Sequence, residues 1–263
     1  MAGKGAEVKS GTPVVPPHIQ PLVDGYKQLY KSNYFTDLTV TCKDREWNIH
    51  KAVAYGQSAF FQKALTGNYT EAKSNQVLLK DDDANLVDAM VHFFYNFDYP
   101  ESDEEQTGIP PIVQDVRMYA IADKYFVRAL QKVAQQKFEA RIAKEWDTPA
   151  FAQAVGEAYA AIPGEDDALK RIIVLAVFKH RGSLLDKAKS HDEFIKMLRA
   201  TPDLGTDLCI AQSPIRFQCS SCEIIFSVCA IELDWTHDAS PWLRCNCYGP
   251  MVLEWWRGHK LKD

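Results

Sequence analysis

Long apolar runs and an excess of positive charge are both absent from this chain of 263 residues. Its longest aliphatic run, Ile172–Phe178, is far shorter than the roughly 20 residues that a membrane-spanning helix needs. Residues 1–20 contain no apolar core of the signal-peptide type. The formal net charge of -5 argues against a general nucleic-acid binder. We therefore expect a cytoplasmic or nuclear protein that does not contact membranes and for which nucleic acid is not the expected partner.

Motifs for catalysis are missing as well. The sequence contains no phosphate-binding glycine loop, no G-x-S-x-G nucleophile elbow and no H-E-x-x-H motif. His50 follows a predicted strand, and we interpret it as a hydrogen-bonded structural residue rather than a general base. We interpret Asp81–Asp83 as turn residues, with Asp83 as the N-cap of the next helix. The sequence therefore predicts a protein that is not an enzyme.

Residues 37–95 carry the clearest pattern of secondary structure. Apolar and polar side chains alternate over residues 37–42, which is typical of a half-buried strand. The alternation continues at 47–49 after a polar turn at 43–46, so the two strands are expected to form a hairpin with a slightly long loop. Because helical spacing follows these strands, the pattern indicates an α+β fold.

Helix signals and a third strand follow the hairpin. Ser58 is the predicted N-cap of a helix that ends at Gly67. Residues 76–80 form the predicted third strand, and a longer helix follows it. The residues predicted to hold this fold together are apolar and lie at core-facing positions of these elements. They are Leu38, Val40, Ile49, Phe61, Val77, Leu79 and Phe94.

Together, these segments resemble the BTB (POZ) domain. The shared pieces are D-L-T-V at 37–40, W-x-I-H-K at 47–51, S-x-F-F at 58–61, Y-x-E at 69–71, Asp81–Asp83, F-F-Y at 93–95 and A-D-K-Y-F-V at 122–127. The resemblance implies a small sheet with a helical layer that serves as a protein-interaction unit. The helices after this unit are similar to those of the short BTB-domain proteins common in fungi.

Composition and spacing divide the chain further. The stretch at 98–111 is acidic and then rich in proline, and we expect a solvated insertion between two helices there. The predicted parts, in order, are a flexible tail at 1–20, the BTB unit at 21–140 with its insertion, a helical extension at 141–200, a linker at 201–213, and a small β-rich cysteine module at 214–263.

Cysteine is rare before residue 200, where Cys42 is the only example, and six of the seven cysteines lie between Cys209 and Cys247. In a reducing compartment such clustering favours metal ligation over disulfide bonds. A C-x-x-C pair and a later C-x-C pair predict a zinc-ribbon-like site, where four thiolates hold one structural zinc ion. A metal also explains how fewer than about fifty residues fold. The predicted zinc ligands are Cys219, Cys222, Cys245 and Cys247.

Two features of the cysteine module leave the ligand set open. Glu223 stands where a glycine usually follows the first cysteine pair, and a C-x-C pair constrains its two ligands more tightly than C-x-x-C does. Cys209, Cys229 or His237 are therefore alternative ligands. The cysteines can instead pack as small apolar residues without any metal.

The BTB resemblance also implies a place for a partner to bind. Some BTB proteins bind cullin scaffolds as substrate adaptors of ubiquitin ligases, and in these an apolar-x-Glu element after the second helix contacts the cullin. Tyr69, Thr70 and Glu71 occupy that position here. The aromatic ring can fill a pocket and the carboxylate can pair with a basic residue. A protein-interaction module is the predicted function, with a cullin as candidate partner and the cysteine module as candidate substrate reader.

Two further hypotheses concern partners. A homodimer is possible through the amphipathic helix predicted at 20–31. The alternative function is a nuclear regulator of transcription or chromatin, whose BTB unit recruits proteins and whose cysteine module contacts nucleic acid. Acidic residues along that module argue against this alternative; they are Glu223, Glu232, Asp234 and Asp238.

Overall fold

The computed structural model describes residues 16–162, 164, 168–186 and 191–212, together with the backbone of four short strands between 214 and 251. The described chain falls into two compact units, which divide after Leu169. Each unit is described by itself below. The predicted flexible tail lies largely outside the described residues, and the first helix begins at Gln20.

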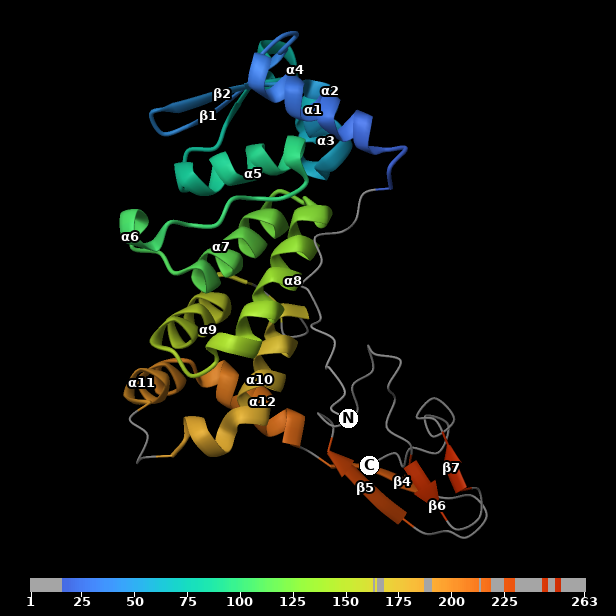
Figure 1. Cartoon of the computed structure of the whole chain (residues 1–263), viewed down its shortest axis with the longest axis vertical. Coiled ribbons are helices and arrows are strands. Elements are labelled where there is room, and N and C mark those ends of the chain that lie inside the picture. Colours follow the sequence, from blue (N-terminus) through green and yellow to red (C-terminus); the bar gives the residue numbers. More distant parts are fainter. Residues whose placement is uncertain are drawn as a thin grey trace, which may run out of the picture. The chain divides into compact units, whose positions relative to one another are not determined.

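A three-stranded sheet lies in the first unit (Figure 1). Its strands are β1 (Leu38–Cys42), β2 (Arg45–Ile49) and β3 (Gln76–Leu78), in the order β2-β1-β3. β1 runs antiparallel to β2 and parallel to β3.

The β1–β2 turn corrects one prediction from the sequence. Cys42 pairs directly with Arg45, so the turn contains only Lys43 and Asp44 and is shorter than the predicted 43–46. Lys43 adopts a φ of 54°. A two-residue hairpin turn commonly needs positive φ, and its usual Gly or Asn signal is missing here.

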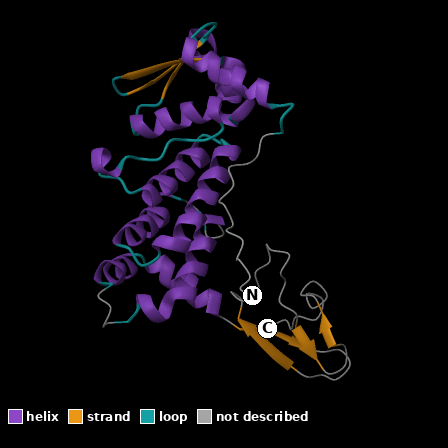
Figure 2. Cartoon of the chain, viewed as in Figure 1, coloured by secondary structure: helices purple, strands orange, loops and turns teal. Residues whose placement is uncertain are grey.

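Nine helices complete the described part of this unit, which is mostly helical (Figure 2). They are α1 (Gln20–Ser32), α2 (Lys51–Gln57), α3 (Ala59–Thr66), α4 (Thr70–Ser74), α5 (Ala84–Asn96), α6 (Glu104–Thr107), α7 (Pro111–Lys124), α8 (Arg128–Glu145) and α9 (Pro149–Ala161). Two predicted caps are confirmed. The Ser58 hydroxyl accepts a hydrogen bond from the Phe61 amide, and the Asp83 carboxylate accepts one from the Asn85 amide.

Apolar side chains from the sheet and from the helices are buried together in the first unit. All seven residues predicted to hold the fold are at most 3% exposed, which confirms that prediction. Burial of apolar surface stabilises the folded state by about 25 cal/mol per Å². This burial is therefore the main stabilising contribution to the fold. The α5 helix contributes most densely, with Met90, Phe93 and Phe94 nearly inaccessible to solvent.

The acidic stretch between α5 and α7 differs from the solvated insertion that we expected. Tyr99 is only 2% exposed, and its hydroxyl donates a hydrogen bond of 2.6 Å to the wholly buried Asp115. Arg141 also donates to Asp115, at 2.8 Å, and Lys137 forms an ion pair with Asp98 at 2.7 Å. This stretch is therefore anchored to α7 and α8 at its first residues, while the short helix α6 is solvent-exposed.

Three helices and two strand pairs are described in the second unit or at its start. They are α10 (Ala168–Leu184), α11 (Asp192–Ala200), α12 (Pro202–Gln212), β4 (Pro214–Gln218), β5 (Ile225–Cys229), β6 (Leu243–Cys245) and β7 (Gly249–Met251). β4 pairs with β5 and β6 pairs with β7, both antiparallel. Among the described residues, no helix is long and apolar enough to cross a membrane.

Helix α12 replaces the linker that we expected at 201–213. It begins at Pro202, and proline is well tolerated in the first turn because its missing N–H has no partner there in any case. Leu204 is wholly buried, so α12 packs against its unit instead of running free in solvent.

Candidate protein-interaction site

The predicted partner-binding residues lie where α3 connects to α4. Tyr69 immediately precedes α4, and Thr70 and Glu71 form its first turn. Tyr69 is 58% exposed, Thr70 is exposed, and Glu71 is half-buried. Tyr69 and Glu71 both line a surface pocket of about 300 Å³, whereas Thr70 does not. The structure therefore brings two of the three predicted residues into one site.

Five residues that the motif did not indicate complete this pocket. Ala59, Phe60, Lys63 and Ala64 come from α3, and Phe126 comes from the turn between α7 and α8. We call the seven lining residues the α3 pocket. The periodicity of the sequence places Phe126 among apolar neighbours, but the residue is 58% exposed. Helical spacing could have grouped the α3 residues, but nothing in the sequence places Phe126 beside them.

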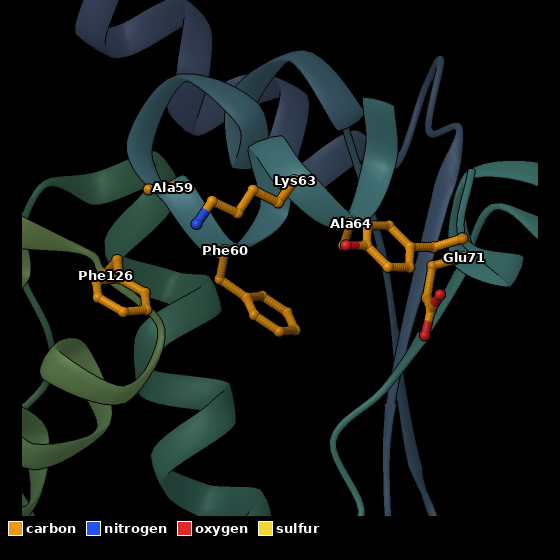
Figure 3. Close-up of a pocket in the computed structure, with 7 residues that line it drawn as sticks. Ala59, Phe60, Lys63, Ala64, Glu71 and Phe126 are labelled. Carbon is orange, nitrogen blue, oxygen red and sulfur yellow. The ribbon is translucent and has the colours of Figure 1, made fainter. Parts of the chain in front are cut away.

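Apolar walls and charged groups coexist in the α3 pocket. Figure 3 shows Phe126 and Glu71 on opposite sides, with Phe60 between them. Within the part of the chain that the structure describes, neither the Lys63 ammonium nor the Glu71 carboxylate has a side-chain hydrogen bond or ion pair. A pocket of this kind can accept an apolar side chain and pair with charged groups beside it.

The S-x-F-F sequence of α3 divides its two aromatic rings between core and pocket. Phe61 is wholly buried, and its ring lies 5.9 Å from that of Phe94. Phe60 is half-buried and lines the pocket with Lys63 and Ala64. Residues three and four apart share one helix face, which explains why these side chains meet.

Gly67 allows the Tyr69 ring to approach the end of α3. A Cβ atom at Gly67 would lie 2.5 Å from two carbons of the Tyr69 ring and 3.1 Å from the Lys63 carbonyl oxygen. Its φ of -81° is open to any residue, so the close approach, and not backbone conformation, is what requires glycine here. The predicted helix end at Gly67 is confirmed, and the residue has this second role.

Phe126 adopts an unusual backbone conformation. Its φ is 53°, in the left-handed region that bulky residues rarely occupy. The turn is closed by a 2.8 Å hydrogen bond from the Val127 amide to the Ala122 carbonyl oxygen. An exposed aromatic ring held in such a conformation makes this turn a candidate for function.

His50, which we interpreted as a structural residue, has clear hydrogen-bond partners. His50 is 8% exposed; its Nε2 lies 2.8 Å from the Tyr34 carbonyl oxygen and its Nδ1 lies 2.8 Å from the Tyr95 hydroxyl. Since a carbonyl oxygen only accepts, we infer that Nε2 carries the proton and Nδ1 accepts from Tyr95. These contacts confirm that His50 is a hydrogen-bonded structural residue.

Most of the predicted zinc ligands lie outside the described residues. Those outside are Cys219, Cys222, Cys247 and the alternative ligand His237. Cys245 ends β6, Cys229 ends β5, and Cys209 is an exposed residue of α12. The described residues contain no group of three or more potential ligands. The zinc site stays a prediction.

Comparison with known proteins identifies the class of the first unit. Residues 26–141 match the family model of the BTB/POZ domain, so this segment is a BTB/POZ domain. The family is generally one of non-catalytic interaction domains. The match covers less than half of the chain, and the sequence predicts a similar range of 21–140.

Part of this chain is similar to curated proteins. Kelch-like protein 41a of Danio rerio is 32% identical over 107 residues, which are 40% of this chain and 16% of that protein. Kelch repeat and BTB domain-containing protein 4 of Homo sapiens is 29% identical over 70 residues, covering 27% of this chain and 13% of that protein. The chain thus spans under a fifth of the length of these relatives.

Among solved structures, the BTB domain of zebrafish PATZ1 aligns with 48% of this chain and 95% of its own, with a TM-score of 0.37 and 14% identity. The BTB domain of human gigaxonin aligns with 47% of this chain and 94% of its own, with a TM-score of 0.34 and 15% identity.

Proposed function

We propose that this protein is a non-catalytic interaction protein whose BTB/POZ domain binds a cullin scaffold through the α3 pocket. The observation that carries the proposal is that Tyr69 and Glu71 line the same pocket as Phe60 and Phe126. The Y-x-E element that the BTB resemblance associates with cullin binding is therefore combined with an apolar wall. Kelch-type relatives of the same domain are consistent with this assignment.

The exposed area of Tyr69 sets the expected strength of the contact. The Tyr69 residue is 58% exposed in the free protein, so a partner can bury a large part of its surface. Aromatic residues buried at interface centres typically cost about 2 kcal/mol or more when truncated to alanine, which corresponds to about 30-fold in Kd. Glu71 adds a charge that a basic residue of the partner can pair with.

The test compares two double variants of the full chain. Tyr69→Ala with Glu71→Ala removes the predicted contacts, and Tyr55→Ala with Glu46→Ala removes the same residue types from exposed positions outside the pocket. Calorimetric titration with the N-terminal domain of a cullin should show at least a tenfold higher Kd for the first variant and less than a threefold change for the second. Equal affinities for all three proteins would exclude the pocket as the cullin site.

We further propose that the C-terminal module binds one structural zinc and reads the substrate. The sequence places Cys219 and Cys222 between the paired strands β4 and β5, and Cys247 between the paired strands β6 and β7. Connections between paired strands are where zinc-ribbon ligands occur. Metal analysis of the purified chain should give one zinc per molecule, and a Cys219→Ser with Cys222→Ser variant should lose it. A wild-type chain without zinc would contradict the proposal.

We also propose that the protein forms a homodimer through α1. Val23 is the buried residue of this helix, whereas the neighbouring Leu22 is 62% exposed. A second copy of α1 would cover this apolar side chain.

A further inference from the structure

Asp82 makes contacts that its own turn does not require. The residue lies between β3 and α5, where the capping of α5 is performed by Asp83. The Asp82 carboxylate is only 10% exposed, and it accepts hydrogen bonds from the Lys124 ammonium at 2.8 and 2.9 Å and from the Tyr125 hydroxyl at 2.5 Å. It therefore connects the start of α5 to the end of α7.

Tyr125 carries this connection to the α3 pocket. Its hydroxyl is fixed by Asp82, and its carbonyl oxygen accepts a 2.6 Å hydrogen bond from the Ser58 hydroxyl at the start of α3. Its ring packs edge-to-face against Phe60, with the ring centroids 4.9 Å apart. Tyr125 is only 4% exposed and is held at three points, so the Phe60 ring packs against a side chain that is itself fixed.

The next residue extends the same connection to the other wall. Phe126 follows Tyr125 directly, and its carbonyl oxygen accepts a hydrogen bond from the Ala59 amide at 3.4 Å. Burial, together with the Asp82 charge, raises the pKa of the Tyr125 hydroxyl, which therefore remains a donor. One part-buried hydrogen bond thus connects Asp82, through Tyr125, to both aromatic walls, although Asp82 does not line the pocket.

We propose that Asp82 is a positioning residue of the α3 pocket, acting through the Tyr125 hydroxyl to hold Phe60 and Phe126 in place for a partner. This inference rests on the proposed function for its binding consequence. Its structural part can be measured without any partner.

The first measurement is amide hydrogen exchange in the full chain. Tyr125→Phe removes only the hydroxyl, so the ring still packs against Phe60. We expect the protection of the Ala59 amide against exchange to fall about tenfold, because the lost hydrogen bond to the charged Asp82 carboxylate contributes roughly such a factor. The protection of core amides in α5 should stay unchanged. Equal loss in Ala59 and in α5 would indicate general destabilisation and would overturn the proposal, as would no loss at Ala59.

A series at Asp82 separates positioning from charge. Asp82→Ala should reproduce the loss at Ala59, whereas Asp82→Asn should largely restore protection because its amide oxygen still accepts from Tyr125. Asp81→Asn is the matched control, since it removes one negative charge from an exposed neighbour and should have no effect. An effect of the control equal to that of Asp82→Ala would refute the role of Asp82.

The second measurement is the affinity for the N-terminal domain of a cullin. Asp82→Ala and Tyr125→Phe should raise Kd about three- to tenfold, with Asp82→Asn close to wild type. Unchanged affinity of Tyr125→Phe despite lost Ala59 protection would contradict the binding role. If the wild-type chain itself does not bind the cullin, the proposed function fails, and the exchange data alone then decide whether Asp82 positions the pocket.

Discussion

Asp115 provides a quantitative prediction about stability and pH. Its carboxyl group is wholly buried on α7, and this burial raises its pKa from 3.8 to about 6, although hydrogen bonds from Tyr99 and Arg141 act in the opposite direction. The folded protein therefore binds this proton more tightly than the unfolded chain does. The resulting stabilisation is fully present below pH 3.8 and is lost as the pH rises through 6.

The size of the effect follows from the two pKa values. A difference between 3.8 and about 6 corresponds to about 3 kcal/mol in the free energy of unfolding. Between pH 4 and pH 7 we expect Asp115 to lower that free energy by about 2–3 kcal/mol. Physically, ionised Asp115 loses more hydration than Arg141 and Tyr99 replace.

Asp115→Asn removes the titration and supplies the control. Its amide still accepts from Tyr99 but presents N–H to Arg141, so the substitution has a cost in stability of its own, and position 115 of the variant contributes no pH dependence. Urea unfolding at pH 4, 5, 6 and 7, followed through the NMR signals of α7 amides, isolates the first unit from the second. The stability of wild type relative to the variant should fall by about 2–3 kcal/mol over this range. A constant difference would show that pairing with Arg141 balances burial, and a difference that rises with pH would show that pairing outweighs it; either result would refute the prediction.

Two further predictions concern the surface. Gly67→Ala should change the free energy of unfolding by less than about 1 kcal/mol, because the φ of this residue suits alanine. The variant should nevertheless raise the Kd for the cullin domain severalfold, because the new Cβ atom displaces the Tyr69 ring. Urea titration would measure the stability and calorimetry the Kd, and an unchanged Kd would show that the position of the ring does not matter. Leu22→Asp should convert the proposed α1 dimer to a monomer in light scattering, and a wild-type monomer at micromolar concentration would exclude that dimer.

Local signals in the sequence were sufficient for much of the first unit. Alternation predicted β1 and β2, and a side-chain oxygen at the right place predicted the caps Ser58 and Asp83. These signals depend on neighbours within a few residues, so a sequence shows them directly. The Lys43–Asp44 turn was misplaced because a lysine with positive φ leaves no compositional signal.

Contacts between distant segments explain the remaining differences. Tyr99 lies in an acidic stretch whose composition predicts exposure to solvent. Only the fold places Asp115 beside it. Two of the seven residues that line the α3 pocket were accessible from the Y-x-E element, since Tyr69 and Glu71 are only two positions apart in the chain. Phe60 and Phe126 were not, because they are more than sixty residues apart and meet through Tyr125.

The Y-x-E element at 69–71 is therefore an incomplete description of the proposed binding surface, the α3 pocket. Tyr69 contributes one aromatic ring, whereas the wall opposite Glu71 is Phe126, which comes from the turn between α7 and α8 and lies outside the Y-x-E element. A BTB domain with the same Y-x-E but without the hydrogen bond from the Tyr125 hydroxyl to Asp82 would leave that wall unfixed. Ordering it on binding costs on the order of 0.5–1.5 kcal/mol per side chain, enough to change Kd severalfold. Affinity for a partner should thus depend on the α7–α8 turn as well as on the element after α3.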